Sequence, residues 1–176
     1  MSRAHLLAEG VLASKPLTLR FLAGFTDANC AIQKPNLPNH IVWSLGHLAI
    51  TMHRLAEHID RRPLPTADFL YGGSLDGGGD TARFASESVA FASHPNPDAS
   101  HYPNLDRARE IFENAVDRLA AALRNASEEA LDAPVPWGRA IFPVWQLAFR
   151  MIFHNGMHAG QITDMRRALE LQGVIG

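Results

Sequence analysis

The stretch IFPVWQLAFRMIFHNGMHAGQITDMRRALEL (141–171) decides the fold. It carries one set of residues at intervals of three and four, which predicts a long helix that buries this face. The set consists of Leu147, Met151, His154, His158, Ile162, Met165 and Leu169. Two histidines therefore occupy positions at which the pattern predicts buried apolar side chains. Because a buried imidazole needs partners for its ring nitrogens, these two residues are the first candidates for a functional site.

His154 and His158 lie one helical turn apart, about 6 Å along the axis, so both rings can be directed at one point. This HxxxH spacing is the one by which a helix presents two imidazoles to a metal ion. Asn155 stands where the zinc-protease motif HExxH has its glutamate, which excludes that class of enzyme. Gly156 removes side-chain bulk between the two histidines. Two core histidines, bonded to the backbone or to each other, are an alternative interpretation.

Three further segments have the apolar spacing of long helices, at about 3–28, 39–60 and 104–125. Pro16 predicts a kink or a break in the first of them, because proline has no amide hydrogen to donate. Asn39 is expected to cap the second helix at its N-terminus. Together with 141–171, these segments predict an all-α fold, an antiparallel four-helix bundle that forms a single domain over residues 1–176.

The long connector 61–103, between the second and third helices, is rich in glycine and proline, with one short helix expected near residues 81–92. Loops of this length are uncommon in compact domains and are either functional lids or mobile insertions, and the sequence leaves both open. Four of its polar residues are candidates to close over a site, although solvated loop residues are the default interpretation. They are Asp76, Asp80, His94 and His101.

The composition restricts the classes of function. The 176 residues have a net charge of −2 and no run of basic residues, so neither nucleic-acid binding nor membrane-surface binding is expected. Cys30 is the only cysteine, which indicates a reducing compartment. No signal peptide or membrane-spanning stretch is recognisable, so the sequence predicts a cytoplasmic protein. Nine histidines are many for this length, and histidine is the commonest protein ligand of transition metals.

A metal ion needs at least one more ligand, which a facing helix of a bundle can supply. The segment 39–60 offers His40, His47, His53 and His58. His47 lies in the middle of this helix, whereas His40 and His58 lie at its ends, where exposure to solvent is expected. His53 lies on another face. The spacing favours His47 without excluding the others.

The segments WSLGHLA (43–49) and FHNGMHAGQITDMRRALEL (153–171) resemble the DinB-like superfamily. The resemblance extends over the layout of the whole chain: four helices, a long connector after the second, and HxxxH in the fourth. It implies a divalent metal ion held by His47, His154 and His158, with water in the open positions, and a homodimer, which relatives often form. Because residues 61–103 match no pattern of the family, the resemblance carries no substrate over to this chain.

A divalent ion held by three neutral imidazoles keeps its charge and an open position, so it lowers the pKa of a bound water or thiol. Family functions include thiol-dependent transferases, a mycothiol-dependent isomerase and metal-dependent hydrolases. The resemblance therefore favours a thiol-dependent transferase or hydrolase acting on a small molecule, with a low-molecular-weight thiol as a candidate partner. Zinc or nickel is the expected metal, and iron or manganese is also compatible.

Two other functions stay open, a non-catalytic metal- or ligand-binding module and a metal-free bundle that binds a partner. No general base is predicted from the sequence. Gln161 could orient a bound water, but an ordinary helix residue is the favoured interpretation. Trp43 is interpreted as a core residue, and Cys30 as a buried or linker thiol without a catalytic partner.

Overall fold

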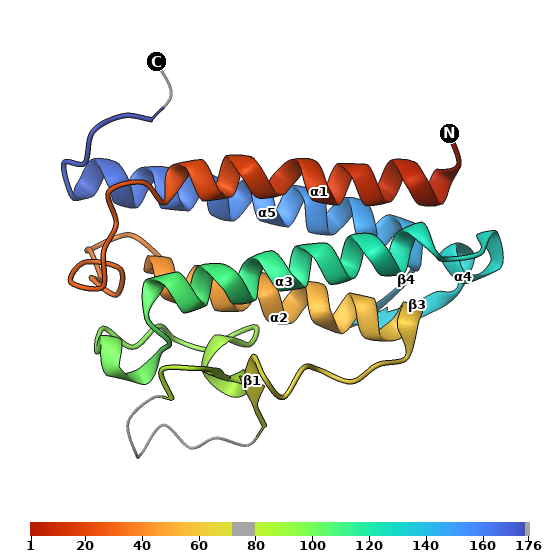
Figure 1. Cartoon of the computed structure of the whole chain (residues 1–176), viewed down its shortest axis with the longest axis horizontal. Coiled ribbons are helices and arrows are strands. Elements are labelled where there is room, and N and C mark those ends of the chain that lie inside the picture. The colour runs from red at the N-terminus through yellow and green to blue at the C-terminus, as the bar shows by residue number, and fades with distance from the viewer. Residues whose placement is uncertain (72–79, 175–176) are drawn as a thin grey trace.

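A computed structural model describes residues 1–71 and 80–174 and shows a mostly helical protein. Four long helices lie side by side (Figure 1): α1 (Arg3–Phe21), α2 (Ile41–Asp60), α3 (Leu105–Arg124) and α5 (Val144–Ala168). Helix α1 packs against α3 and α5, and α2 packs against the same two helices. Their apolar faces form one core. No described helix is both long and apolar enough to cross a membrane.

The directions of these helices depart from the predicted antiparallel arrangement. Figure 1 shows α1 and α5 running one way and α2 and α3 running the other, so the neighbours α2 and α3 are parallel. The long connector explains this difference. After α2 the chain returns along the outside of the helices, and α3 begins at the same end as α2. A long crossover connection is what a parallel pair of neighbouring helices requires.

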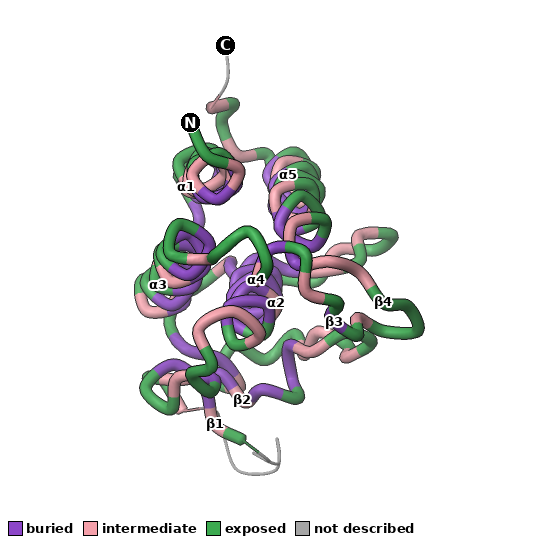
Figure 2. Tube along the Cα trace, turned by 90° about the vertical axis from the view of Figure 1, so that its right-hand side faces the viewer, coloured by how far each residue is buried: buried purple, intermediate pink, exposed green. Residues whose placement is uncertain are grey.

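Helix α2 is buried around nearly its whole circumference (Figure 2). Helices α3 and α5 cover two sides, and the 3-10 helix η2 (Ser86–Val89) of the connector packs against it as well. The connector also contains the parallel two-residue strands β1 (Phe69–Leu70) and β2 (Phe84–Ala85), and a second 3-10 helix, η3 (Ala99–His101). A strand and a 3-10 helix therefore replace the short helix expected near 81–92, and this part of the connector is packed against the helices.

The ends of α1 and α2 differ from the expected ones. Helix α1 ends at Phe21, not near residue 28, and continues through Pro16 without being split. Arg166 of α5 donates hydrogen bonds to the carbonyl oxygens of Phe21, at 3.0 Å, and of Ala23, and so fixes the chain where α1 ends. The residue that caps α2 is His40, whose Nδ1 accepts from the amide of Trp43 at 3.2 Å.

A β-hairpin precedes α5 and was not predicted. Helix α4 (Glu128–Asp132) leads into β3 (Pro134–Trp137), which pairs antiparallel with β4 (Ala140–Pro143) around Gly138, at a φ of 63°. Because residues 140–143 pair with β3, α5 begins at Val144 and not at residue 141. The signal in the sequence was Gly138 between two short apolar segments, PVPW (134–137) and AIFP (140–143).

Candidate metal centre

Helices α2 and α5 bring three histidine side chains together. The ligating nitrogens of His47, His154 and His158 all lie within 4.8 Å of one another. The two Nε2 atoms on α5 are 3.1 Å apart, and the ring of His47 lies 5.1 and 5.2 Å from those of His154 and His158. His47 and His158 are buried and His154 is half-buried. The structure therefore brings together the three residues that the resemblance implied.

The connector fixes the orientation of the His47 ring. The Nδ1 of His47 lies 2.8 Å from the carbonyl oxygen of Val89, at the end of η2. A carbonyl only accepts, so Nδ1 carries the proton and Nε2 keeps its lone pair. Trp43 stacks on the imidazole with ring centroids 4.7 Å apart and 9° between the planes. Its own Nε1 donates to the carbonyl oxygen of Ser88 at 2.9 Å, so the connector fixes both rings.

Gly46 allows the connector to come this close to α2. A Cβ at this position would lie 2.7 Å from Cε1 of Phe84 and 2.9 Å from Cγ1 of Val89, closer than real Cβ contacts. Gly156 is different, because a Cβ there would meet nothing within 4 Å apart from the adjoining chain. A side chain at position 156 would therefore fit without a clash. The expectation that a glycine is needed between the two histidines is not supported by the structure.

All three imidazoles are held neutral. Burial lowers the pKa of His154 to about 4 and that of His158 to about 3. Repulsion between neighbouring imidazoles, if both were protonated, lowers these pKa values further. Burial also lowers the pKa of His47. Neutral rings keep the lone pairs that a metal needs. With metal–nitrogen bonds of about 2.0–2.1 Å, a tetrahedral ion separates its ligands by roughly 3.3 Å. The observed 3.1 Å between two ligand atoms fits this value.

The polar surroundings of the α5 histidines are incomplete. The Nδ1 atoms of His154 and His158 are buried without a hydrogen-bond partner among the described residues. The Gln161 side chain lies near His158 but does not reach normal hydrogen-bond geometry with it. Its Oε1 accepts from Nδ2 of Asn39 at 3.1 Å. Gln161 therefore lies near the site, and its hydrogen bond joins α5 to Asn39.

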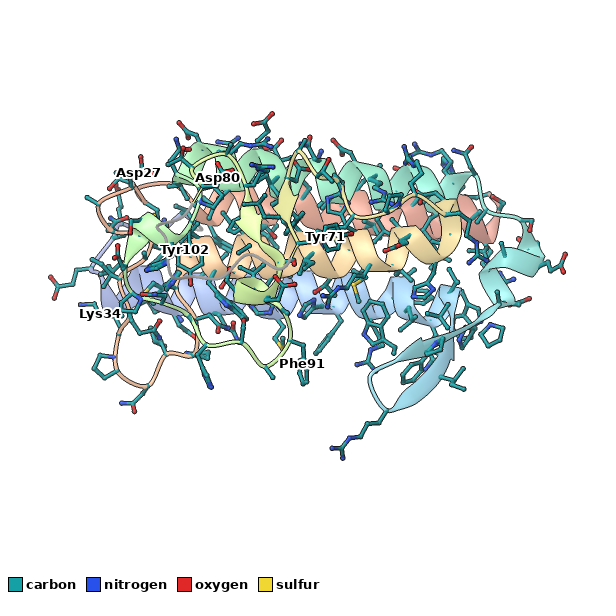
Figure 3. The ribbon with its side chains drawn as sticks, turned by 90° about the horizontal axis from the view of Figure 1, so that it is seen from below. Asp27, Lys34, Tyr71, Asp80, Phe91 and Tyr102 are labelled. Atoms are coloured by element: carbon teal, nitrogen blue, oxygen red, sulfur yellow. The ribbon has the colours of Figure 1, made fainter. Side chains whose placement is uncertain are left out.

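A cavity of about 1340 Å³ adjoins the three histidines, and His47 and His154 contribute to its wall. The other walls come from α2, α5, the β3–β4 hairpin and Phe91 of the connector. Figure 3 shows Phe91 extending from the connector on the side on which the hairpin also projects. Asp80, His94 and His101 do not line this cavity. Asp76 lies outside the described residues.

The remaining candidates have other roles. His58 lines the cavity but is not part of the three-histidine cluster. His53 is buried and accepts from Arg118 at 3.2 Å. His40 is fully buried, so its predicted exposure is wrong; its Nε2 donates to the carbonyl oxygen of Asn96 at 2.9 Å. Cys30 is buried, and burial raises the pKa of its thiol to about 11, which agrees with an unreactive thiol.

Two buried histidines outside the cluster predict that the protein loses stability in acid. Burial lowers the pKa of His40 to about 4 and that of His53 to about 3. In the unfolded chain the pKa is about 6.5, so below this pH the unfolded state binds protons that the folded state does not. The stabilising contribution is complete above pH 6.5 and is lost as the pH falls towards the folded pKa values. At pH 5.5 the loss is about 1.4 kcal/mol for each histidine.

Urea denaturation at pH 7.5 and 5.5, with a chelator present throughout, measures this loss. The His40→Asn variant keeps a side chain that can cap α2 and removes one titrating group. Its unfolding free energy should therefore fall by about 1.4 kcal/mol less than that of the wild type between pH 7.5 and 5.5. A free energy of unfolding that is equal at the two pH values would contradict the burial of neutral imidazoles.

The sequence profile of the DinB superfamily matches residues 13–162. The chain belongs to the DinB superfamily. The crystal structure of a conserved protein from Enterococcus faecalis has a similar fold, with a TM-score of 0.66 over 95% of this chain and 96% of that one. At 16% sequence identity, this likeness concerns the fold alone. A comparison with curated proteins found no match.

Reasoning from the sequence missed three features at the site of this DinB protein. The carbonyl group of Val89 carries no signal, because every residue has one. Arg54 and Arg150, which line the cavity, did leave a signal. Arg54 lies seven residues after His47, and Arg150 lies four residues before His154. Residues at these intervals share a helix face, so each arginine could have been placed beside a candidate ligand.

Proposed function

We propose that this DinB protein is a divalent-metal-dependent enzyme that acts on a small molecule, as a thiol-dependent transferase or a hydrolase. The ligands are His47, His154 and His158, and zinc or nickel suits this set of imidazoles first. One observation carries the proposal: three neutral imidazoles from two helices meet beside a large cavity. When bound, a divalent ion lowers the pKa of a thiol or water and makes it nucleophilic near neutral pH.

The number of protein ligands supports an enzyme over a structural site. Structural zinc sites usually have four protein ligands, whereas catalytic sites keep a position for a substrate or water. Within the described part of the chain, no further histidine, cysteine or carboxylate joins the three. The protein itself holds the ligands: the Val89 carbonyl group fixes the His47 ring, and Trp43 covers one face of it. His47 and His154 also line the cavity, so a molecule in the cavity can reach the cluster.

A panel of small thiols with the electrophile monobromobimane tests turnover. Protein loaded with zinc, nickel or manganese should consume thiol and electrophile faster than the uncatalysed reaction. A chelator should abolish the difference, and added metal should restore it. Nitrophenyl acetate without thiol tests the hydrolase alternative in parallel. Turnover that continues in chelator would contradict the proposal, and bound metal without turnover on any substrate would favour the non-catalytic module.

A further inference from the structure

Three arginines of the cavity wall have no acidic partner. Arg54 and Arg61 come from α2 and its C-terminal end, and Arg150 comes from α5. None of the three has a carboxylate within 4.0 Å among the described residues, although Glu57 lines the same cavity. Most other arginines do form ion pairs: Arg3, Arg62, Arg83, Arg107, Arg109, Arg118, Arg124 and Arg167. The cavity wall therefore carries three guanidinium groups that no ion pair with a described residue neutralises.

Two of these arginines lie close to the histidines. Arg54 follows His47 by seven residues and Arg150 precedes His154 by four, on the same helix faces. Arg54, Arg150, His47 and His154 all line the same cavity. Arg150 lies over the Phe142 ring of the hairpin, with its Cζ 4.9 Å from the ring centroid. The hairpin thus holds one guanidinium group beside the site.

The same cavity exposes large apolar side chains. Phe91 from the connector is 89% exposed, and Phe153 from α5 is 74% exposed. Met157 and Trp137 add further apolar surface to the wall. Gathered exposed apolar side chains mark a binding surface more often than isolated ones do. The wall therefore offers positive charge near the histidines and apolar surface around it, which suits a molecule with both characters.

We propose that this cavity binds a small molecule with a carboxylate or phosphate group and an apolar body, its anionic group being held by Arg54 and Arg150. Guanidinium groups pair with both kinds of anion through two parallel hydrogen bonds. Apolar contact with Phe91 and Phe153 would hold the body of the molecule. This inference rests on the proposed function of the three-histidine site and names the class of molecule that the site accepts.

Binding of three matched probes to the metal-free protein tests the inference. The probes are 2-naphthoate, 2-naphthyl phosphate and the neutral 2-naphthamide, followed by isothermal titration. At least one of the two anions should bind about tenfold or more tightly than the amide, a difference of about 1.4 kcal/mol. The tighter anion identifies the preferred group. Its affinity should also fall as the salt concentration rises, because salt screens charges at exposed sites.

Arginine variants decide whether this preference comes from the proposed residues. Both Arg54 and Arg150 are exposed, so Arg54→Gln and Arg150→Gln should fold normally, as circular dichroism would verify. Each should weaken binding of the preferred anion about tenfold and leave binding of the amide unchanged. Arg20→Gln is the matched control, because Arg20 is exposed on α1 and does not line the cavity. Equal binding of anions and amide, or arginine variants that bind like the wild type, would overturn the inference.

The same titrations in the His154→Ala variant separate this inference from the proposed function. The arginines remain in that variant, so the preference for anions should persist. A wild-type protein that keeps the preference for anions but binds no metal and has no turnover would contradict the enzyme proposal alone. An active metalloprotein that does not distinguish the anions from the amide would contradict the anion site alone.

Discussion

Replacing His154 by alanine is expected to abolish stable metal binding. The substitution removes one of three nitrogens that lie within 4.8 Å of one another, and the remaining two leave an ion with mostly solvent ligands. Loss of an outer partner of a ligand already costs about 10–100-fold in affinity, so loss of a ligand should exceed 100-fold. Elemental analysis of the purified protein and a competition titration against a chelating dye measure both the metal content and the affinity.

Thermal unfolding provides a second readout of the same change. A ligand that binds only the folded state stabilises it by about 4 kcal/mol at a thousandfold excess over its dissociation constant. Added metal should therefore raise the melting temperature of the wild type and leave that of His154→Ala nearly unchanged. The matched control is His58→Ala, which removes a histidine from the same cavity but not from the cluster. Equal metal content in His154→Ala and His58→Ala would exclude the three-histidine site.

Replacing Gly46 by alanine should destabilise the protein, although the same change usually stabilises a helix by about 1 kcal/mol. The new Cβ would lie 2.7 Å from the buried Phe84 ring and 2.9 Å from Val89. Overpacking of this kind costs about 1–3 kcal/mol, so a net loss is expected. Movement of Val89 would also break the hydrogen bond from Nδ1 of His47 to the Val89 carbonyl oxygen. Metal affinity should then fall about 10–100-fold.

Gly156→Ala is the matched control, because it places the same methyl group on α5 where nothing lies within 4 Å. It should keep the metal affinity and gain up to about 1 kcal/mol in stability. Urea denaturation in chelator and metal titration separate the two effects for both variants. If Gly46→Ala proved as stable as Gly156→Ala and kept its metal affinity, the connector would not hold His47 as described.

The parts of the fold that follow from local spacing could be predicted from the sequence. The helix 104–125 agrees with α3 to within one residue at each end, and Asn104 caps it through the amide of Arg107. The starts of α2 and α5 were less accurate. They depend on His40 as a cap and on the pairing of residues 140–143 with β3, contacts that an apolar pattern does not contain. The common direction of α2 and α3 likewise depends on the path of the connector.

The candidate site divides in the same way. His154 and His158 follow from helical spacing, because both occupy core positions of one helix. His47 needed the resemblance, since four histidines lie in or beside the second helix and spacing alone left the choice open. The role of Val89 depends on a backbone group brought near by tertiary packing. Gly46 is visible in the sequence, but only the position of Phe84 gives it a reason.

The distribution of the three histidines over α2 and α5 has a consequence for how the protein matures in the cell. While α5 is still inside the ribosome, His47 is the one member of the cluster that has emerged, and a single imidazole retains an ion poorly. A metal ion bound as proposed would therefore be retained only after α5 has been synthesised and has docked. A chain released before α5 is made would lack His154 and His158 and could not form the proposed metal centre.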